Sequence, residues 1–125
     1  GGGAAELATA RELERCRETV KGLEGFGLAV VAEALRRPLA QIAVNAGFSP
    51  LEKVEQAKAA GALAGSAAIG IDCDTGELID MIEHRIIDPL AVKLHAVRTA
   101  GEVAAAVLRI RTVIRMRQDG EPTSS

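Results

Sequence analysis

Aromatic residues are almost absent from this sequence. It has no Trp and no Tyr, and only two Phe among 125 residues, although hydrophobic residues make up 48%. Alanine alone occupies 23 positions. Each small side chain buries little area, so such a core depends on close approach between helices. We expect part of this core to be completed by surfaces outside these residues.

Cysteine and long apolar runs are scarce as well. Cys16 and Cys73 stand alone, without CxxC or paired-histidine spacing, which argues against a disulfide or a zinc site. No run approaches the roughly eighteen apolar residues of a membrane span, and no basic stretch precedes an apolar one. We therefore expect a cytoplasmic protein. The opening Gly-Gly-Gly without Met predicts an excised, processed or incomplete chain.

The charge balance also excludes some partners. A net charge of −2 and a pI of about 5.7 favour neither nucleic acid nor an anionic membrane. The arginines at positions 109, 111, 115 and 117 have no aromatic residues among them, which again argues against nucleic acid. His84 and His95 have no Cys or carboxylate partner at catalytic spacing, so both are expected to be surface residues.

Most of the first sixty residues have the period of an α-helix. We expect helices at about 4–19, from about residue 25 onward, and at about 49–60. The second of these carries two neighbouring apolar faces, which predicts a largely enclosed helix. Pro38 predicts a break or kink near Arg37. The small residues 61–68 predict a mobile loop.

The C-terminal third begins with a long predicted helix, from Pro89 to about Arg109. Its apolar residues recur at steps of four and three, as in a core helix with one solvated side. Residues 110–117 then alternate apolar and polar, which predicts a strand. Residues 118–125 predict a disordered tail after a single domain at 1–117. The predicted fold class is mainly α: a multi-helix bundle with a small β-hairpin and a C-terminal strand.

The stretch with the most recognisable chemistry runs from Gly70 to Pro89 and reads GIDCDTGELIDMIEHRIIDP. Two short apolar runs flank a predicted turn, with Gly76 able to adopt positive φ. Asp88 is placed to cap the following helix, and Pro89 suits its first position. From the residues alone, Asp72 starts a turn and Asp88 caps a helix, and neither residue predicts a bound ligand.

Four segments, in this order and spacing, resemble the chaperonins, the ring-forming ATP-driven folding machines. They are Gly1-Gly2-Gly3-Ala4, the helix at 38–47, the GID…TGE…DM pattern between Gly70 and Met81, and Ile87-Asp88-Pro89. The GID…TGE…DM pattern is similar to the archaeal and eukaryotic cytosolic (thermosome) type, and the helix at 38–47 is similar to the bacterial GroEL type. The resemblance implies the C-terminal half of a chaperonin equatorial domain.

The resemblance also implies an ATP site. In it, Asp88 accepts hydrogen bonds from the ribose hydroxyls, Ile87 faces the base, and the segment 72–74 lines the adenine and sugar. The glycines at the start let backbone approach ribose or phosphate, although three glycines also fit a flexible end. The implied nucleotide-binding residues are Gly2, Gly3, Asp72, Cys73, Asp74, Ile87 and Asp88. Arg85 departs from the family pattern, because glycine is usual there.

The phosphate side of the implied site is missing from these residues. The sequence has no Gly-Asp-Gly-Thr-Thr loop to hold phosphates and Mg²⁺, and no segment with the water-positioning carboxylate; both are expected upstream of Gly1. We therefore expect no catalytic residue and no metal ligand here. The implied partners are other subunits of a ring and unfolded proteins. An alternative is a helical interaction module that has lost nucleotide binding and assembles through its terminal strand.

Overall fold

The computed structural model describes the backbone of residues 1–119 and the side chains of residues 1–111, 114 and 115. The chain forms two compact units, Gly1–Ile87 and a second that begins at Asp88. Within the described residues the regular structure is four helices and one two-stranded sheet, which confirms the mainly α prediction with its small hairpin. None of the helices described is both long and apolar enough to span a bilayer.

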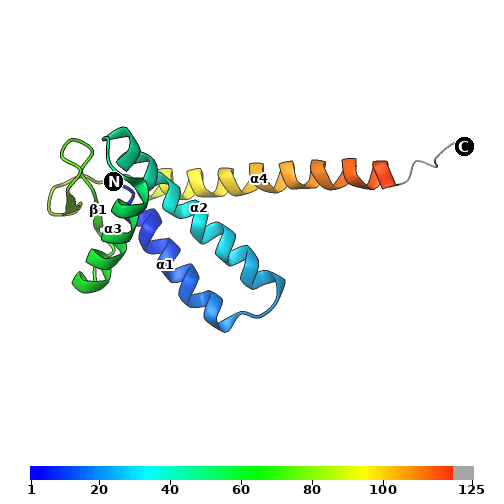
Figure 1. Cartoon of the computed structure of the whole chain (residues 1–125), viewed down its shortest axis with the longest axis horizontal. Coiled ribbons are helices and arrows are strands. Elements are labelled where there is room, and N and C mark those ends of the chain that lie inside the picture. Colours follow the sequence, from blue (N-terminus) through cyan, green and yellow to red (C-terminus); the bar gives the residue numbers. More distant parts are fainter. Residues whose placement is uncertain (120–125) are drawn as a thin grey trace, which may run out of the picture. The chain divides into compact units, whose positions relative to one another are not determined.

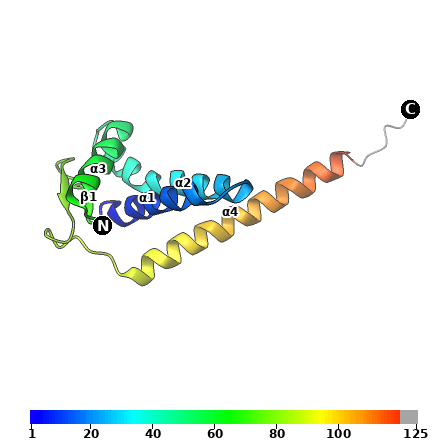
Figure 2. The same ribbon diagram turned by 90° about the horizontal axis from the view of Figure 1, so that it is seen from below.

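The first unit is built on two antiparallel helices. α1 (Ala4–Thr19) and α2 (Leu23–Asn45) lie side by side in Figures 1 and 2. Their small contact residues let the two helices approach closely, as the alanine content predicts. Arg36 of α2 forms an ion pair with Glu14 of α1, which adds a polar bridge to the contact. The hydrophobic residues buried between them are Ala10, Ala32 and Leu35.

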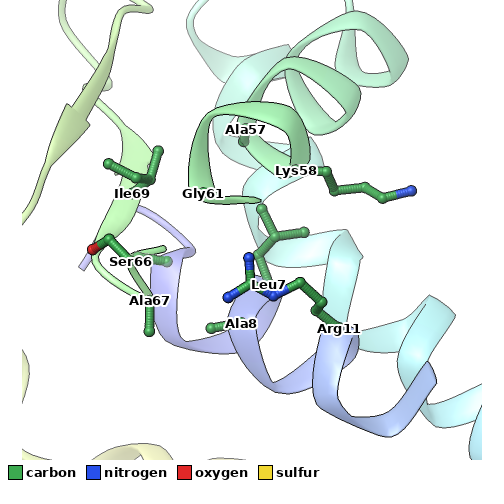
Figure 3. A pocket seen from close by; sticks show the side chains of 10 residues that line it. Leu7, Ala8, Arg11, Ala57, Lys58, Gly61, Ser66, Ala67 and Ile69 are labelled. Carbon is green, nitrogen blue, oxygen red and sulfur yellow. The ribbon is translucent and has the colours of Figure 1, made fainter. Parts of the chain in front are cut away.

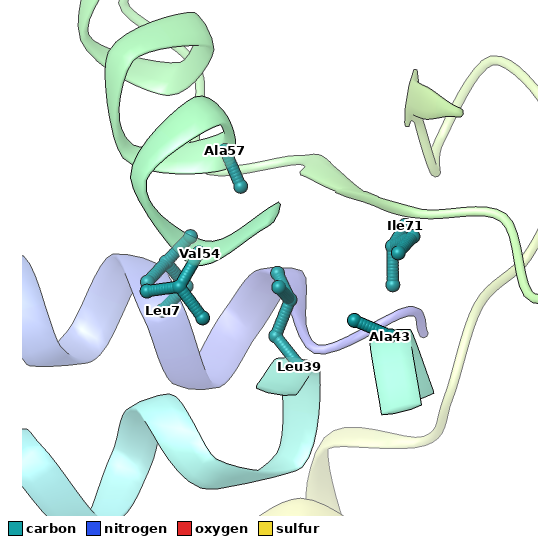
Figure 4. Close-up of a cluster of buried hydrophobic side chains, with 6 residues drawn as sticks. All are labelled: Leu7, Leu39, Ala43, Val54, Ala57 and Ile71. Atoms are coloured by element: carbon teal, nitrogen blue, oxygen red, sulfur yellow. The ribbon is translucent and has the colours of Figure 1, made fainter. Parts of the chain in front are cut away.

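A third helix and the sheet pack against this pair. α3 (Pro50–Ala64) is capped by Ser49, whose hydroxyl oxygen accepts a hydrogen bond from the Glu52 amide at 3.4 Å. β1 (Ile69–Ile71) pairs antiparallel with β2 (Leu78–Asp80). Side chains from α1, α2, α3 and β1 meet in one core (Figure 4). Its buried residues are Leu7, Leu39, Ala43, Val54, Ala57 and Ile71.

Of the break or kink predicted near Arg37, the break is wrong, because α2 continues through Pro38. Proline costs a helix interior about 3 kcal/mol, since it removes one hydrogen bond and crowds the preceding turn. Leu35 and Leu39 are both buried on either side of it. Burying these two side chains offsets that cost only if the helix stays continuous, and Pro38 itself is exposed.

The prediction that α2 is enclosed on two faces is also wrong. Leu23, Phe26 and Val30 are 86%, 66% and 69% exposed. Only the face that meets α1, α3 and β1 is buried. A helix can bury as many faces as it has neighbours, and within the described residues of the first unit α2 packs on one side only.

Residues 61–68 are more ordered than the predicted loop. α3 continues to Ala64, and only the four residues after it connect the helix to β1. Gly61 is buried, and a Cβ there would lie 3.3 Å from the Ser66 carbonyl oxygen. The alanines around Gly61 have high helix propensity, which outweighs the lack of a clear apolar period.

The strand predicted at residues 110–117 is wrong, because α4 (Leu90–Asp119) is one continuous helix. Ile110 and Ile114 are four residues apart, a spacing that places them on one side of either a strand or a helix. A helix pairs its own backbone groups, whereas a strand needs a neighbour, and the sheet among the described residues contains only β1 and β2. From residue 120 onward, the predicted tail lies outside the described residues.

The side chains of α4 also differ from the prediction of a core helix. Leu90, Leu94 and Val97 are exposed, and so is Leu108. In its described part, the second unit consists of this helix and the two residues before it. A single helix cannot bury its own apolar stripe. The periodicity therefore predicts the helix correctly, but it does not show whether another element covers the stripe.

Candidate functional site

The turn between β1 and β2 is held by Asp72. Its Oδ1 accepts hydrogen bonds from the amides of Asp74 at 2.8 Å and Thr75 at 3.4 Å. The backbone closes around it, because the Asp72 carbonyl accepts from the Gly76 amide and the Asp72 amide donates to the Glu77 carbonyl, each at 2.8 Å. Gly76 has φ of +72°, the left-handed conformation that the sequence predicted. Hydrogen bonds within the chain therefore determine the conformation of this turn, residues 72–76.

The turn gathers three of the predicted site residues. One carboxylate oxygen of Asp72, one of Asp74 and the Sγ of Cys73 lie within 4.8 Å of one another. Cys73 and Asp74 are exposed, and Asp72 is half-buried. Ionised carboxylates only accept hydrogen bonds. The group can therefore bind hydroxyl or amino groups, and it repels phosphates.

The N-terminal glycines form an ordered turn rather than a flexible end. The Gly1 carbonyl accepts from the Ala4 amide at 3.2 Å, and the Gly2 carbonyl accepts from the Ile71 amide at 3.1 Å. A Cβ on Gly2 would lie 2.8 Å from the Ile71 carbonyl oxygen, and one on Gly3 would lie 2.7 Å from the Leu39 Cβ. Glycine is thus required here by contacts within the chain. Its proposed contact with a nucleotide stays a prediction.

A second turn follows β2 and leads to Ile87. The Oδ1 of Asp80 accepts from the amides of Ile82 at 2.8 Å and Glu83 at 3.1 Å. The turn ends at Arg85, whose φ of +59° is the left-handed conformation that favours glycine. This positive φ is a physical reason for the glycine that the resemblance implies at position 85. Ile87 is exposed after the turn.

Asp88 opens the second unit, one residue further from its helix than predicted. α4 begins at Leu90, and the carbonyl of Pro89 accepts from the amide of Lys93 at 3.4 Å. One Asp88 carboxylate oxygen lies 3.1 Å from the Lys93 Nζ. This hydrogen bond and the lysine's charge hold the pKa of the Asp88 carboxyl below its usual value. Asp88 is therefore ionised at neutral pH and can accept hydrogen bonds, as the implied contact with the ribose hydroxyls requires.

A small cavity in the first unit is too small for a nucleotide. Figure 3 shows Leu7 of α1 facing Ala57 and Gly61 of α3 across it. Arg11 and Lys58 also line it. Its volume of about 20 Å³ holds about one water molecule. None of the predicted site residues lines this cavity.

Two contacts of the site residues were not predicted from the sequence. Lys93 pairs with Asp88 at a spacing of five, which no helical pair rule suggests. The Phe48 ring packs on Gly76 from a distant part of the chain. No local signal could reveal this second contact, because the two residues belong to different elements.

The fold and the site so far define a mainly helical protein with a turn that carries hydrogen-bond acceptors. Comparison with known proteins identifies the family. The model of the TCP-1/cpn60 chaperonin family matches residues 1–118. Over 114 residues the chain is 40% identical to a thermosome subunit of Pyrococcus abyssi, covering 91% of this chain and 20% of that one. It is 35% identical to a thermosome subunit of Methanocaldococcus jannaschii, covering 91% and 21%. The chain therefore belongs to the TCP-1/cpn60 chaperonin family.

Solved structures agree. The chain superposes on a group III chaperonin in the open state with a TM-score of 0.83 and 39% identity, over 87% of this chain and 22% of that one. For an open-state monomer of a group II chaperonin from Methanococcoides burtonii, the TM-score is 0.81 and the identity 32%, over 87% and 27%. The predicted resemblance to thermosome-type chaperonins is confirmed. The chain spans about a fifth of the length of the curated relatives it matches.

Proposed function

We propose that this chain forms the ribose and base side of the ATP site of a cytoplasmic chaperonin subunit. Residues other than these 125 would hold the phosphates and Mg²⁺, because the sequence contains no Gly-Asp-Gly-Thr-Thr loop. Other subunits of a ring are the proposed direct partners, and unfolded proteins are partners of the complete subunit. The proposed nucleotide-binding residues are Gly2, Gly3, Asp72, Cys73, Asp74, Ile87 and Asp88.

The turn at residues 72–76 is the observation that supports this proposal. Its shape depends on hydrogen bonds between its own residues, so it is formed before any ligand arrives. Preorganised acceptors spend little free energy on ordering when a ligand binds. The carboxylates of Asp72 and Asp74 fit sugar hydroxyls and an exocyclic amine, and they disfavour phosphate. This set of acceptors therefore fits the sugar and base side of a nucleotide and not the phosphate side.

Asp88 adds a second acceptor of the same kind. Its carboxyl is ionised at neutral pH, with a pKa lowered further by Lys93, and an ionised carboxylate can accept from two neighbouring hydroxyls at once. Asparagine keeps one acceptor and replaces the other with a donor. Asp88→Asn is therefore a selective test of the ribose role, because Asp88 is exposed and a surface ion pair such as that with Lys93 contributes little to stability.

The test uses a chimera, the Pyrococcus abyssi thermosome subunit with its matched 114 residues replaced by those of this chain. ATP affinity is measured by calorimetry, and thermal stability separately. We expect the chimera to bind ATP, and Asp88→Asn or Asp72→Asn to weaken binding by about tenfold at nearly unchanged stability. Glu18→Gln, an exposed carboxylate change on α1, is the matched control. Unchanged ATP affinity in both site variants would remove the proposed role.

The 125-residue chain by itself should hydrolyse no ATP above buffer. Phosphoryl transfer depends on positioning the phosphates and neutralising their charge, and the residues for both tasks are not in this sequence. Magnesium-dependent turnover by the purified chain that persists after a final purification step would contradict this expectation.

One observation favours the alternative, a helical interaction module without nucleotide binding. Leu23, Phe26 and Val30 form an exposed apolar stripe on α2. A stripe of this kind is typical of a surface that another polypeptide covers. The terminal strand through which the module was expected to assemble is part of α4 instead. A chimera that folds and assembles but binds no ATP would favour this alternative.

A further inference from the structure

Phe48 lies at the junction of three elements of the first unit. It follows the last turn of α2, where its amide donates to the Ala43 carbonyl at 2.9 Å. The helix end thus fixes the backbone of Phe48. Its side chain is one of two aromatic rings in the chain and is not fully buried, with the residue 38% exposed. Nothing in its local sequence explains why a ring should stand here.

The ring packs directly on the turn that carries the candidate site. A Cβ placed on Gly76 would overlap three carbons of the Phe48 ring, so the ring occupies the space that any other residue at 76 would need. Gly76 is buried in consequence. The Gly76 amide in turn donates to the Asp72 carbonyl at 2.8 Å. The Phe48 ring therefore contacts Gly76, and Gly76 is joined to Asp72 by this hydrogen bond.

Lys53 holds the same ring from α3. Its Nζ lies 4.8 Å from the centroid of the Phe48 ring, within the range of a cation–π interaction. Lys53 sits in the first turn of α3, whose own start is fixed by Ser49. The ring is thus in contact with the turn and with α3, while its backbone belongs to the end of α2.

We propose that Phe48 is the positioning residue of the turn at 72–76. Its ring fixes Gly76, and through Gly76 it fixes where Asp72 and Asp74 present their carboxylates. The relevance of this contact to nucleotide binding rests on the function proposed above. The positioning of the turn does not, so the two can fail separately.

Amide hydrogen exchange on the 125-residue chain tests the positioning. In Phe48→Ala, exchange at the Gly76 and Asp74 amides should quicken by about tenfold, while amides in the α1–α2 contact keep their rates. Phe48→Leu should fall between, and Lys53→Met should show a smaller local change. Leu51→Ala removes an exposed apolar side chain from the same region and should change neither amide.

Two results would overturn the proposal. One is unchanged exchange at Gly76 and Asp74 in Phe48→Ala and Phe48→Leu. The other is an equal acceleration throughout the chain in Phe48→Leu and Lys53→Met, which would mean that the ring supports the whole unit. These milder variants decide the matter if Phe48→Ala does not fold.

ATP affinity of the chimera provides the second readout. Phe48→Leu should weaken ATP binding several-fold without lowering the thermal midpoint, because only the site's geometry changes. Equal ATP affinity despite a loosened turn would remove Phe48 from the nucleotide site. A parent chimera that binds no ATP would contradict the proposed function, and the exchange rates would still decide whether Phe48 positions the turn.

Discussion

The two turns on either side of β2 have the same design and different tolerances. In each, an aspartate Oδ1 accepts from two following amides, Asp72 in the first turn and Asp80 in the second. Each ends at a residue with positive φ, Gly76 at +72° and Arg85 at +59°. The first turn is pressed against Phe48, whereas Arg85 is exposed. Positive φ alone thus permits a residue with a side chain, at a cost in conformational strain, as at Arg85. At Gly76 the Phe48 ring also occupies the space of a Cβ, so only glycine fits.

The C-terminal end of α3 provides a reference for the second turn. There Gly65 has the same φ of +59°, and the amides of Gly65 and Ser66 donate to the Ala62 and Gly61 carbonyls. The amides of Arg85 and Ile86 donate to the Ile82 and Met81 carbonyls in the same pattern. Both are the Schellman arrangement that ends helices, with glycine in one case and arginine in the other.

The largest effect is expected at the first turn. Gly76→Ala adds strain from positive φ and a clash with the Phe48 ring, and it should lower the free energy of unfolding by about 2–4 kcal/mol. Urea unfolding measures it. The same substitution in a Phe48→Ala background should cost less, since only the backbone strain remains. Equal costs in both backgrounds would mean that the ring is not the obstacle.

The aspartates should have smaller and similar effects. Asp72→Ala and Asp80→Ala each remove an acceptor for two amides, which costs about 1 kcal/mol in comparable caps. The hydrogen bonds of Asp80 are 2.8 and 3.1 Å long, whereas those of Asp72 are 2.8 and 3.4 Å, so Asp80→Ala should cost at least as much. Asparagine at either position should be nearly neutral in the same unfolding assay. A large cost for asparagine would show that charge matters to the turn.

Arg85→Gly should stabilise the chain. It relieves positive-φ strain of about 1–2 kcal/mol, less the greater freedom of glycine in the unfolded chain, so we expect a gain of about 0.5–1 kcal/mol. Arg85→Ala is the control, because it removes the side chain and keeps the strain. Gly65→Ala should show the opposite sign at the equivalent position of α3. A gain with Arg85→Ala equal to that with Arg85→Gly would contradict the strain argument.

The smallest effect concerns pH, at the start of α4. The folded-state pKa of Asp88 is lowered by Lys93, so the pair contributes stability above the unfolded pKa of about 3.8 and loses it as pH falls through the folded value. Lys93→Met should raise the pKa of Asp88, as followed by NMR titration of its carboxyl carbon. An unchanged titration would mean that the lysine does not act on Asp88 in solution.

What the sequence by itself determined about this protein depends on neighbouring residues. The helices at 4–19 and from Pro50, the Ser49 cap, the turn at Asp72–Gly76 and the family resemblance could all be read from local patterns. Each depends on hydrogen bonds or steric limits between residues a few positions apart. For the candidate site, this is enough to predict which residues gather in the turn and why Gly76 has positive φ.

Only the tertiary structure decided what depends on distant residues. Continuation of α2 through Pro38 requires burial of Leu35 and Leu39 against other elements, and the exposure of Phe26 reflects a missing neighbour. The segment 110–117 fits both periods, so backbone pairing rather than pattern makes it helical. Phe48 reaches Gly76 only when α2, α3 and the hairpin are assembled. Packing between distant segments sets these outcomes, and no local pattern carries that information.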